Sequence, residues 1–230
     1  MLENPNSVMI EHAAAMLGDL CSSVVFVGGC VAGLFLTNVR AHQIRPTKDV
    51  DVVTKVASVR AYQRVEAALI RRGFLHDVRP DAPICRWVHN GLTLDLMPSE
   101  PGILSFHNCW YPLAVDTAQS VLLPSGHSIA VISAPVFIAT KIEAFKVRGQ
   151  RDFAASHDLE DIVTVVDGRA ELLGEVHAAS TELRAYLTRE FTALIASTSF
   201  MDALAGHLPG DAGSQARLPG VIRRLRLLAA

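Results

Sequence analysis

The segment that most constrains the fold is residues 25–54, which read VFVGGCVAGLFLTNVRAHQIRPTKDVDVVT. A β-branched and aromatic run ends at Gly28 and Gly29, and helix-tolerant residues follow. After a loop, acids and valines alternate in KDVDVVT, so Asp49 and Asp51 are expected on one face of a strand and the valines on the other. The segment therefore predicts a strand, a tight glycine turn, a buried helix and a second strand.

The composition indicates a chain with a substantial core and gives no evidence of its own for a strongly charged partner. Half of the 230 residues are hydrophobic, 19% are charged, and the formal net charge is -2. This length can bury a sizeable core, while the near-neutral balance gives no general attraction to nucleic acid or to a membrane surface. The four cysteines lack the spacing of a zinc site, so we expect free thiols in a reducing compartment.

The first residues do not have the pattern of a secretory signal, because they are acidic and lack a basic segment before an apolar one. Residues 20–39 are uncharged, but the adjacent glycines in their middle disfavour a long helix. We therefore expect no membrane partner and a cytoplasmic location.

A hairpin is the clearest local prediction in the chain. Asn90 and Gly91 are typical of a type I′ turn, and alternating strands flank them in ICRWVHNGLTLDLMP. In the return strand the leucines share one face, and Asp95 points to the opposite face. Asp95 is thus expected to be a carboxylate on a strand among apolar neighbours.

The distribution of patterns predicts two parts. Strand patterns occur in about the first 135 residues, and helical patterns dominate afterwards, with Ser133 and Pro135 at the start of one helix and Ser156 as the cap of the next. We expect an α/β or α+β fold in which residues 1–135 form a mixed sheet with flanking helices. Residues 136–230 are expected to form a helical domain that closes over the first.

The three aspartates suggest a metal site. Asp49 and Asp51 on one strand face, with Asp95 from a strand that could lie beside it, would repel one another unless cations were bound. Magnesium prefers such hard oxygen ligands, and two ions can serve an in-line nucleotidyl displacement. The glycine turn offers backbone N–H groups to phosphate, so the two features together predict a triphosphate and magnesium.

These residues resemble the nucleotidyltransferase superfamily typified by polymerase beta, whose pattern is a glycine turn, a D-x-D strand and a third carboxylate. The stretch KIEAFKVRGQRDFAASHDLEDI is similar to the AbiEii class of nucleotidyltransferase toxins and their minimal relatives. The resemblance covers residues 24–166 and implies a nucleotidyltransferase-type sheet domain, 1–135, and a helical domain, 136–230, that closes the nucleotide cleft.

The resemblance also implies roles for individual residues. Asp49, Asp51 and Asp95 would bind two magnesium ions and form the catalytic triad, with Asp158 as a further catalytic acid. The cofactor-binding residues would be Gly28 and Gly29 on the β and γ phosphates, Cys30 in the same turn, and Lys141 as a point charge on the triphosphate. Lys141 could instead be an exposed helix lysine, and Asp158 could merely favour a helix N-terminus.

The implied reaction is transfer of a nucleoside monophosphate from an NTP such as ATP to an acceptor hydroxyl on RNA or tRNA, protein or a small molecule. The AbiEii resemblance adds a toxin role with an antitoxin partner. Ala32 and Gly33 stand where the tRNA enzymes have an arginine and an aspartate, which argues against CCA addition. Arg40 and Arg45, in the loop before Asp49, could reach a phosphate or could simply be solvated.

Two other functions fit parts of the sequence. One is a catalytically inactive nucleotidyltransferase-like scaffold that binds a nucleotide or a protein. The other is a dinucleotide-binding oxidoreductase, since a strand, glycines, a helix and a later acid also outline that fold. The glycine order G-G-x-x-x-G and the two alternating acids favour magnesium over NAD.

Overall fold

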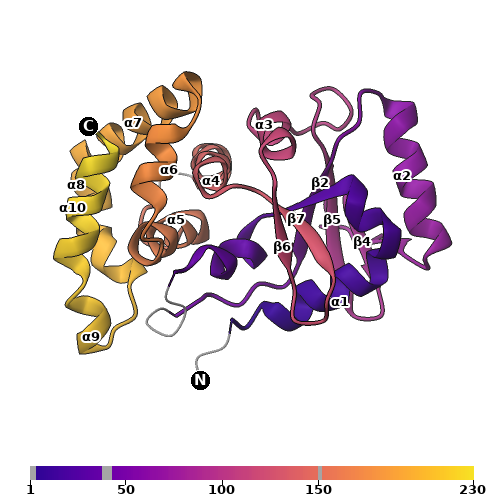
Figure 1. The fold of residues 1–230 in the computed structure, drawn as a ribbon, viewed down its shortest axis with the longest axis horizontal. Coiled ribbons are helices and arrows are strands. Elements are labelled where there is room, and N and C mark those ends of the chain that lie inside the picture. Colours follow the sequence, from indigo (N-terminus) through magenta and orange to yellow (C-terminus); the bar gives the residue numbers. More distant parts are fainter. Residues whose placement is uncertain (1–3, 38–42, 150–151) are drawn as a thin grey trace. The chain divides into compact units, whose positions relative to one another are not determined.

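The computed structural model of the protein describes residues 4–37, 43–149 and 152–230, which places Arg40 outside the described residues. The chain divides into two compact units. Residues 5–31 and 46–133 form the first, here called the sheet unit. Residues 134–230, with the described part of 32–45, form most of the second, here called the helical unit (Figure 1).

The sheet unit is built on a seven-stranded mixed sheet with the strand order β3-β4-β5-β2-β1-β7-β6. Its strands are β1 (Val24–Val27), β2 (Val50–Thr54), β3 (Leu75–His76), β4 (Arg86–His89), β5 (Leu92–Pro98), β6 (Gln119–Leu122) and β7 (Ser128–Val131). The pairs β1–β7 and β2–β5 are parallel, and the other neighbours are antiparallel. The expected mixed α/β fold is confirmed.

The glycine segment adopts the predicted order with one difference in helix type. After β1, Gly28 has a φ of 70°, and η2 (Gly29–Phe35) is a 3₁₀ helix where the sequence led us to expect an ordinary buried helix. Two glycines within seven residues weaken the α-helical preference, and short 3₁₀ segments are common as connectors. The chain then returns as β2, antiparallel to β1.

The predicted hairpin is confirmed in the pairing of β4 with β5. Asn90 and Gly91 have φ values of 46° and 80°, as a type I′ turn requires. Because the turn has two residues, His89 pairs with Leu92 and the register continues to Arg86 opposite Asp95. A local sequence signal thus fixes which residue faces the third aspartate.

Helices cover the sheet within this unit (Figure 1). They are α1 (Ser7–Leu17), followed by the 3₁₀ helix η1 (Gly18–Ser23), then α2 (Val59–Arg71) and α3 (Tyr111–Asp116). Helix α1 packs on β2 and β5, and α3 on β1 and β2. The Ser58 side chain caps α2, accepting a hydrogen bond from the backbone N–H of Ala61 at 3.2 Å.

The helical unit consists of short and medium helices. They are α4 (Ala134–Arg148), α5 (His157–Gly168), α6 (Leu172–Ala178), α7 (Thr181–Ala196), α8 (Thr198–Ala203), η4 (Leu204–His207), α9 (Ala212–Gln215) and α10 (Leu218–Leu228). Helix α4 packs against α5, α6 and α7, and its residues are buried on almost every face. Helix α9 lies within residues 209–220, although the prolines and glycines of this stretch are typical of a loop. In the part of the chain that the structure describes, no helix combines the length and apolar character needed to cross a membrane.

Replacing Gly28 by alanine is expected to destabilise the protein more than replacing Gly102. Both glycines have positive φ, 70° and 79°, so alanine at either position costs about 1–2 kcal/mol of backbone strain. Only at Gly28 would the new Cβ lie 1.9 Å from Oδ2 of Asp51; at Gly102 no described heavy atom lies within 4 Å of it. This clash should add about 1–3 kcal/mol.

Urea unfolding of Gly28→Ala and Gly102→Ala measures the difference. Equal losses of unfolding free energy would show that Asp51 moves aside at no cost, against the close approach described here.

Candidate functional site

The candidate site is a row of side chains across four strands of the sheet unit. Arg86 pairs with Asp95 between β4 and β5, Asp95 with Asp51 between β5 and β2, and Asp51 with Val27 between β2 and β1. Residues in register on neighbouring strands point to the same face. The sheet therefore brings two of the predicted acids together, and it adds an arginine that we had not predicted.

Arg86 joins two of the three aspartates. Its Nε donates to Oδ1 of Asp95 at 2.7 Å, and its Nη2 donates to Oδ2 of Asp95 at 2.7 Å. The same Nη2 donates to Oδ2 of Asp49, also at 2.7 Å. Paired bonds between a guanidinium and a carboxylate are among the strongest in proteins, and hydrogen bonding to Asp95 holds the pKa of Arg86 above its usual range.

The backbone around Asp49 is held by the sheet unit itself. Asp49 precedes β2, and the hydroxyl of Thr47 donates to its carbonyl oxygen at 3.3 Å. The N–H of Thr47 in turn donates to Oδ1 of Asn6 at 2.9 Å, and Asn6 is buried. These bonds set the position from which the Asp49 carboxylate reaches Arg86.

The glycine turn lies directly against the acids. Gly28 follows Val27, the register partner of Asp51, and the Asp51 carboxylate occupies the space that a side chain at position 28 would need. The thiol of Cys30 donates to the carbonyl of Val27 at 3.3 Å. The predicted phosphate-binding turn of Gly28, Gly29 and Cys30 is therefore adjacent to a predicted metal ligand.

Cys85 reports the electrostatic character of the site. Burial, followed by the charges of Asp95 and Asp51, raises the pKa of Cys85 to about 12. Its thiol therefore stays protonated at neutral pH and is a poor nucleophile.

The three aspartates do not fit a pair of magnesium ions as they stand. Arg86 uses both carboxylate oxygens of Asp95 and one of Asp49. Within residues 4–37, 43–149 and 152–230, no group of three or more His, Cys, Asp or Glu side chains is arranged to hold a metal ion. Asp49 and Asp51 by themselves suit one ion, because magnesium usually takes only one or two carboxylates.

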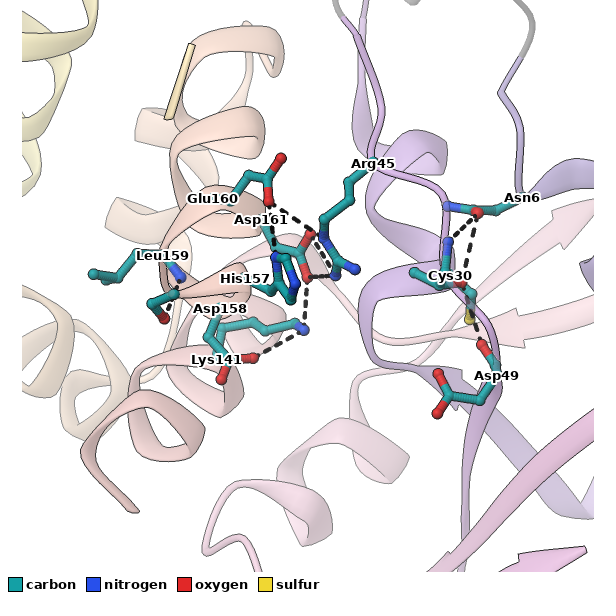
Figure 2. Close-up of polar contacts among 12 residues, drawn as sticks. Asn6, Cys30, Arg45, Asp49, Lys141, His157, Asp158, Leu159, Glu160 and Asp161 are labelled. Atoms are coloured by element: carbon teal, nitrogen blue, oxygen red, sulfur yellow. Dashed lines mark hydrogen bonds and ion pairs between the residues drawn. The ribbon is translucent and has the colours of Figure 1, made fainter. Parts of the chain in front are cut away.

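A second charged cluster lies in the helical unit and contains the other predicted site residues. Nζ of Lys141 on α4 lies 2.7 Å from Oδ2 of Asp161 and 3.2 Å from Oδ1 of Asp158, both on α5 (Figure 2). Arg148 donates two hydrogen bonds to Asp158, at 2.8 and 2.9 Å, and Arg45 donates to Asp161 at 3.0 Å. Lys141 is only 6% exposed, so it is not the exposed helix lysine of the alternative interpretation.

Asp158 is held in its charged form by these partners. Burial by itself would raise the pKa of Asp158, but the hydrogen bonds from Arg148 and the charge of Lys141 lower it below the usual value. Asp158 also lies in the first turn of α5, whose cap is Ser156 as predicted. The ion pairs thus join α4 to α5 by contacts beyond an interaction with the helix dipole.

Sequence reasoning missed Arg86, Asp161 and the pairing of Arg45. A signal for Arg86 was present, since counting back from the two-residue turn places it opposite Asp95. Asp161 stands three residues after Asp158 and therefore shares its helix face. No local signal pairs Arg45 with Asp161, because they are 116 residues apart in sequence.

Comparison with known proteins supports the fold. No protein-family model and no curated protein matches the sequence. The structure is similar to that of an antigenic nucleotidyltransferase-like protein from Paracoccidioides brasiliensis, with a TM-score of 0.53 and 17% identity over 90% of this chain and 94% of that chain. A proposed nucleotidyltransferase from H. pylori matches with a TM-score of 0.44 and 13% identity, over 96% of this chain and 93% of that chain.

The chain therefore has a nucleotidyltransferase-like fold, as the sequence predicted. The sheet also argues against the dinucleotide-binding alternative. In such a fold the strands before and after the glycine turn are parallel, whereas β1 and β2 are antiparallel.

Asp158→Asn is expected to lower the free energy of unfolding at pH 7 by about 1–3 kcal/mol, because it removes a buried charge that pairs with Lys141 and Arg148, although Lys141 keeps its contact with Asp161. Asp116→Asn is the matched control: Asp116 pairs with Lys55 at 2.9 Å, but both side chains are largely exposed, so little change is expected. Chemical unfolding of the three proteins measures both effects. Equal losses in the two variants would contradict a structural role for the buried pairs.

The Asp158→Asn variant should also change how the free energy of unfolding, measured by chemical unfolding at a series of pH values, depends on pH. Because the pKa of Asp158 is lower in the folded protein, its ionisation stabilises the fold above about pH 4, and this contribution is lost as the pH falls further. Wild type should therefore lose stability more steeply than Asp158→Asn below about pH 4.

Proposed function

We propose that the protein is a nucleotidyltransferase that moves a nucleoside monophosphate from an NTP to an acceptor hydroxyl and releases pyrophosphate. The observation that carries this proposal is the cross-strand row that sets Asp51 and Asp95 side by side, with Gly28 against Asp51. The nucleotidyltransferase-like fold supports it. The closeness of these acids to the glycine turn supports a shared site for a metal ion and a triphosphate.

Asp49 and Asp51 are the proposed ligands of a magnesium ion. Such an ion would neutralise charge on the triphosphate and activate the attacking hydroxyl. The backbone N–H groups at Gly28 and Gly29 are the proposed phosphate contacts, with Cys30 in the same turn. Asp95, fixed by Arg86, is the proposed acid that faces the attacking hydroxyl.

The roles of Lys141 and Asp158 follow from the sequence resemblance. We retain Lys141 as a proposed triphosphate contact and Asp158 as a proposed catalytic acid. Their pairing with each other, at 3.2 Å, and with Asp161 and Arg148 supports a further role in joining α4 to α5.

The test is to incubate the purified chain with each α-labelled NTP and magnesium, alone and with total RNA, and to follow the label. Asp51→Asn should reduce transfer at least about a hundredfold, since the metal contributes several kcal/mol of charge stabilisation. Asp116→Asn should retain wild-type transfer, because Asp116 lies in an exposed ion pair outside the row. Label that stays on the NTP in every wild-type reaction, or moves equally with Asp51→Asn, would contradict the proposal.

The destination of the label identifies the acceptor class. Label on RNA, with a tRNA fraction tested separately, indicates a nucleic-acid acceptor, and label on the chain or an added protein indicates a side-chain hydroxyl. A role as an AbiEii-like toxin with an antitoxin is proposed from the sequence resemblance alone, and growth arrest on expression, abolished by Asp51→Asn, would support it.

A second candidate function is a nucleotidyltransferase-like scaffold without turnover. The pairing of Arg86 with Asp95 and Asp49 favours it, because the guanidinium competes with a metal ion for both oxygens of Asp95 and one oxygen of Asp49. Magnesium-dependent NTP binding without transfer to any acceptor would distinguish this scaffold from the enzyme.

A further inference from the structure

The cation that bridges Asp49 and Asp95 is a side chain of the protein itself, Arg86. We propose that Arg86 is a resident cation that takes the place of one metal ion, so that the site binds one divalent ion fewer than its carboxylates would bind without the guanidinium. The proposal rests on the proposed function in one respect, that the aspartates form the metal site.

The geometry carries the first step. Nη2 of Arg86 lies 2.7 Å from Oδ2 of Asp49 and 2.7 Å from Oδ2 of Asp95, so a single cationic group bridges carboxylates from two neighbouring strand segments. A metal ion shared between those carboxylates would need the same oxygens. Nε also donates to the other oxygen of Asp95 at 2.7 Å, so a metal ion at Asp95 would have to share both oxygens with the guanidinium and would meet its positive charge at close range.

The fold maintains the pairing. The two-residue turn at Asn90 and Gly91 sets Arg86 directly opposite Asp95, and opposite charges at such positions stabilise an antiparallel pair. Asp95 is only 7% exposed, and a buried carboxylate without a partner is costly. A divalent ion would therefore have to displace the Arg86 guanidinium, which is bonded to both oxygens of Asp95. Because Arg86 belongs to the same chain, its effective concentration at Asp95 is high, and it rebinds easily.

The charge balance agrees with a single ion. Three ionised aspartates and one guanidinium leave a formal charge that one divalent ion neutralises. Without Arg86, the same three carboxylates would exceed the charge of one ion and would favour a second. The arginine thus sets the metal capacity of the site.

The experiment counts Mn²⁺ ions bound by the full chain, using Mn²⁺ alone and electron paramagnetic resonance of the free ion. Arg86→Met, which keeps the length of the side chain and removes its charge, should bind one ion more per chain than wild type. The additional ion should disappear in the double variant Arg86→Met with Asp95→Asn. Arg189→Met is the control, because Arg189 pairs with Glu190 on α7 of the helical unit, and it should bind as wild type does.

Equal counts for wild type and Arg86→Met would overturn the proposal, as would a wild-type ion that is lost in Asp95→Asn. Circular dichroism checks folding of each variant. If Arg86→Met does not fold, the double variant, which removes both charges together, decides: it should bind the wild-type number of ions, and a loss would show that Asp95 ligates metal in the native protein. The count requires no turnover, so its outcome is separate from the label-transfer test.

Discussion

The ion pair between Arg86 and Asp95 is the interaction on which the candidate site depends. It allows a carboxylate to be buried in the middle of a sheet, because a charged group in that position needs a charged, hydrogen-bonded partner. It also reaches Asp49 through the same guanidinium. In this way one residue of β4 organises acids carried by β5 and by the residue before β2.

The approach of Asp51 to Gly28 is the second constraint, and it explains why the glycine turn and the acids occur in one segment. The antiparallel pairing of β1 with β2 places Asp51 opposite Val27, so its carboxylate lies over the next residue of the chain. A residue with a Cβ at position 28 would meet that carboxylate and would also need a positive φ. Both the positive φ and the close approach of Asp51 therefore require glycine at position 28. This requirement holds whether or not the turn binds a phosphate.

The sequence predicted those parts of the fold that depend on local rules. The hairpin followed from Asn90-Gly91, and the cap of α5 followed from Ser156. The elements α3, β3 and β6 were missed because they are short, and β6 has the mostly exposed sequence QSVL without an apolar alternation. The partners of Lys141 could not be predicted, since the packing of α4 on α5 depends on contacts throughout the helical unit and not on either helix alone.

A crystal structure of the full chain grown with Mn²⁺ and a non-hydrolysable NTP, with the metal located by its anomalous scattering, is the decisive test of the candidate site. We expect density for a metal at Asp49 and Asp51, the phosphates at Gly28 and Gly29, and Arg86 still bonded to both oxygens of Asp95. A metal bound to Asp95 with Arg86 displaced would contradict the role of the arginine. A nucleotide and metal bound elsewhere would contradict the site itself.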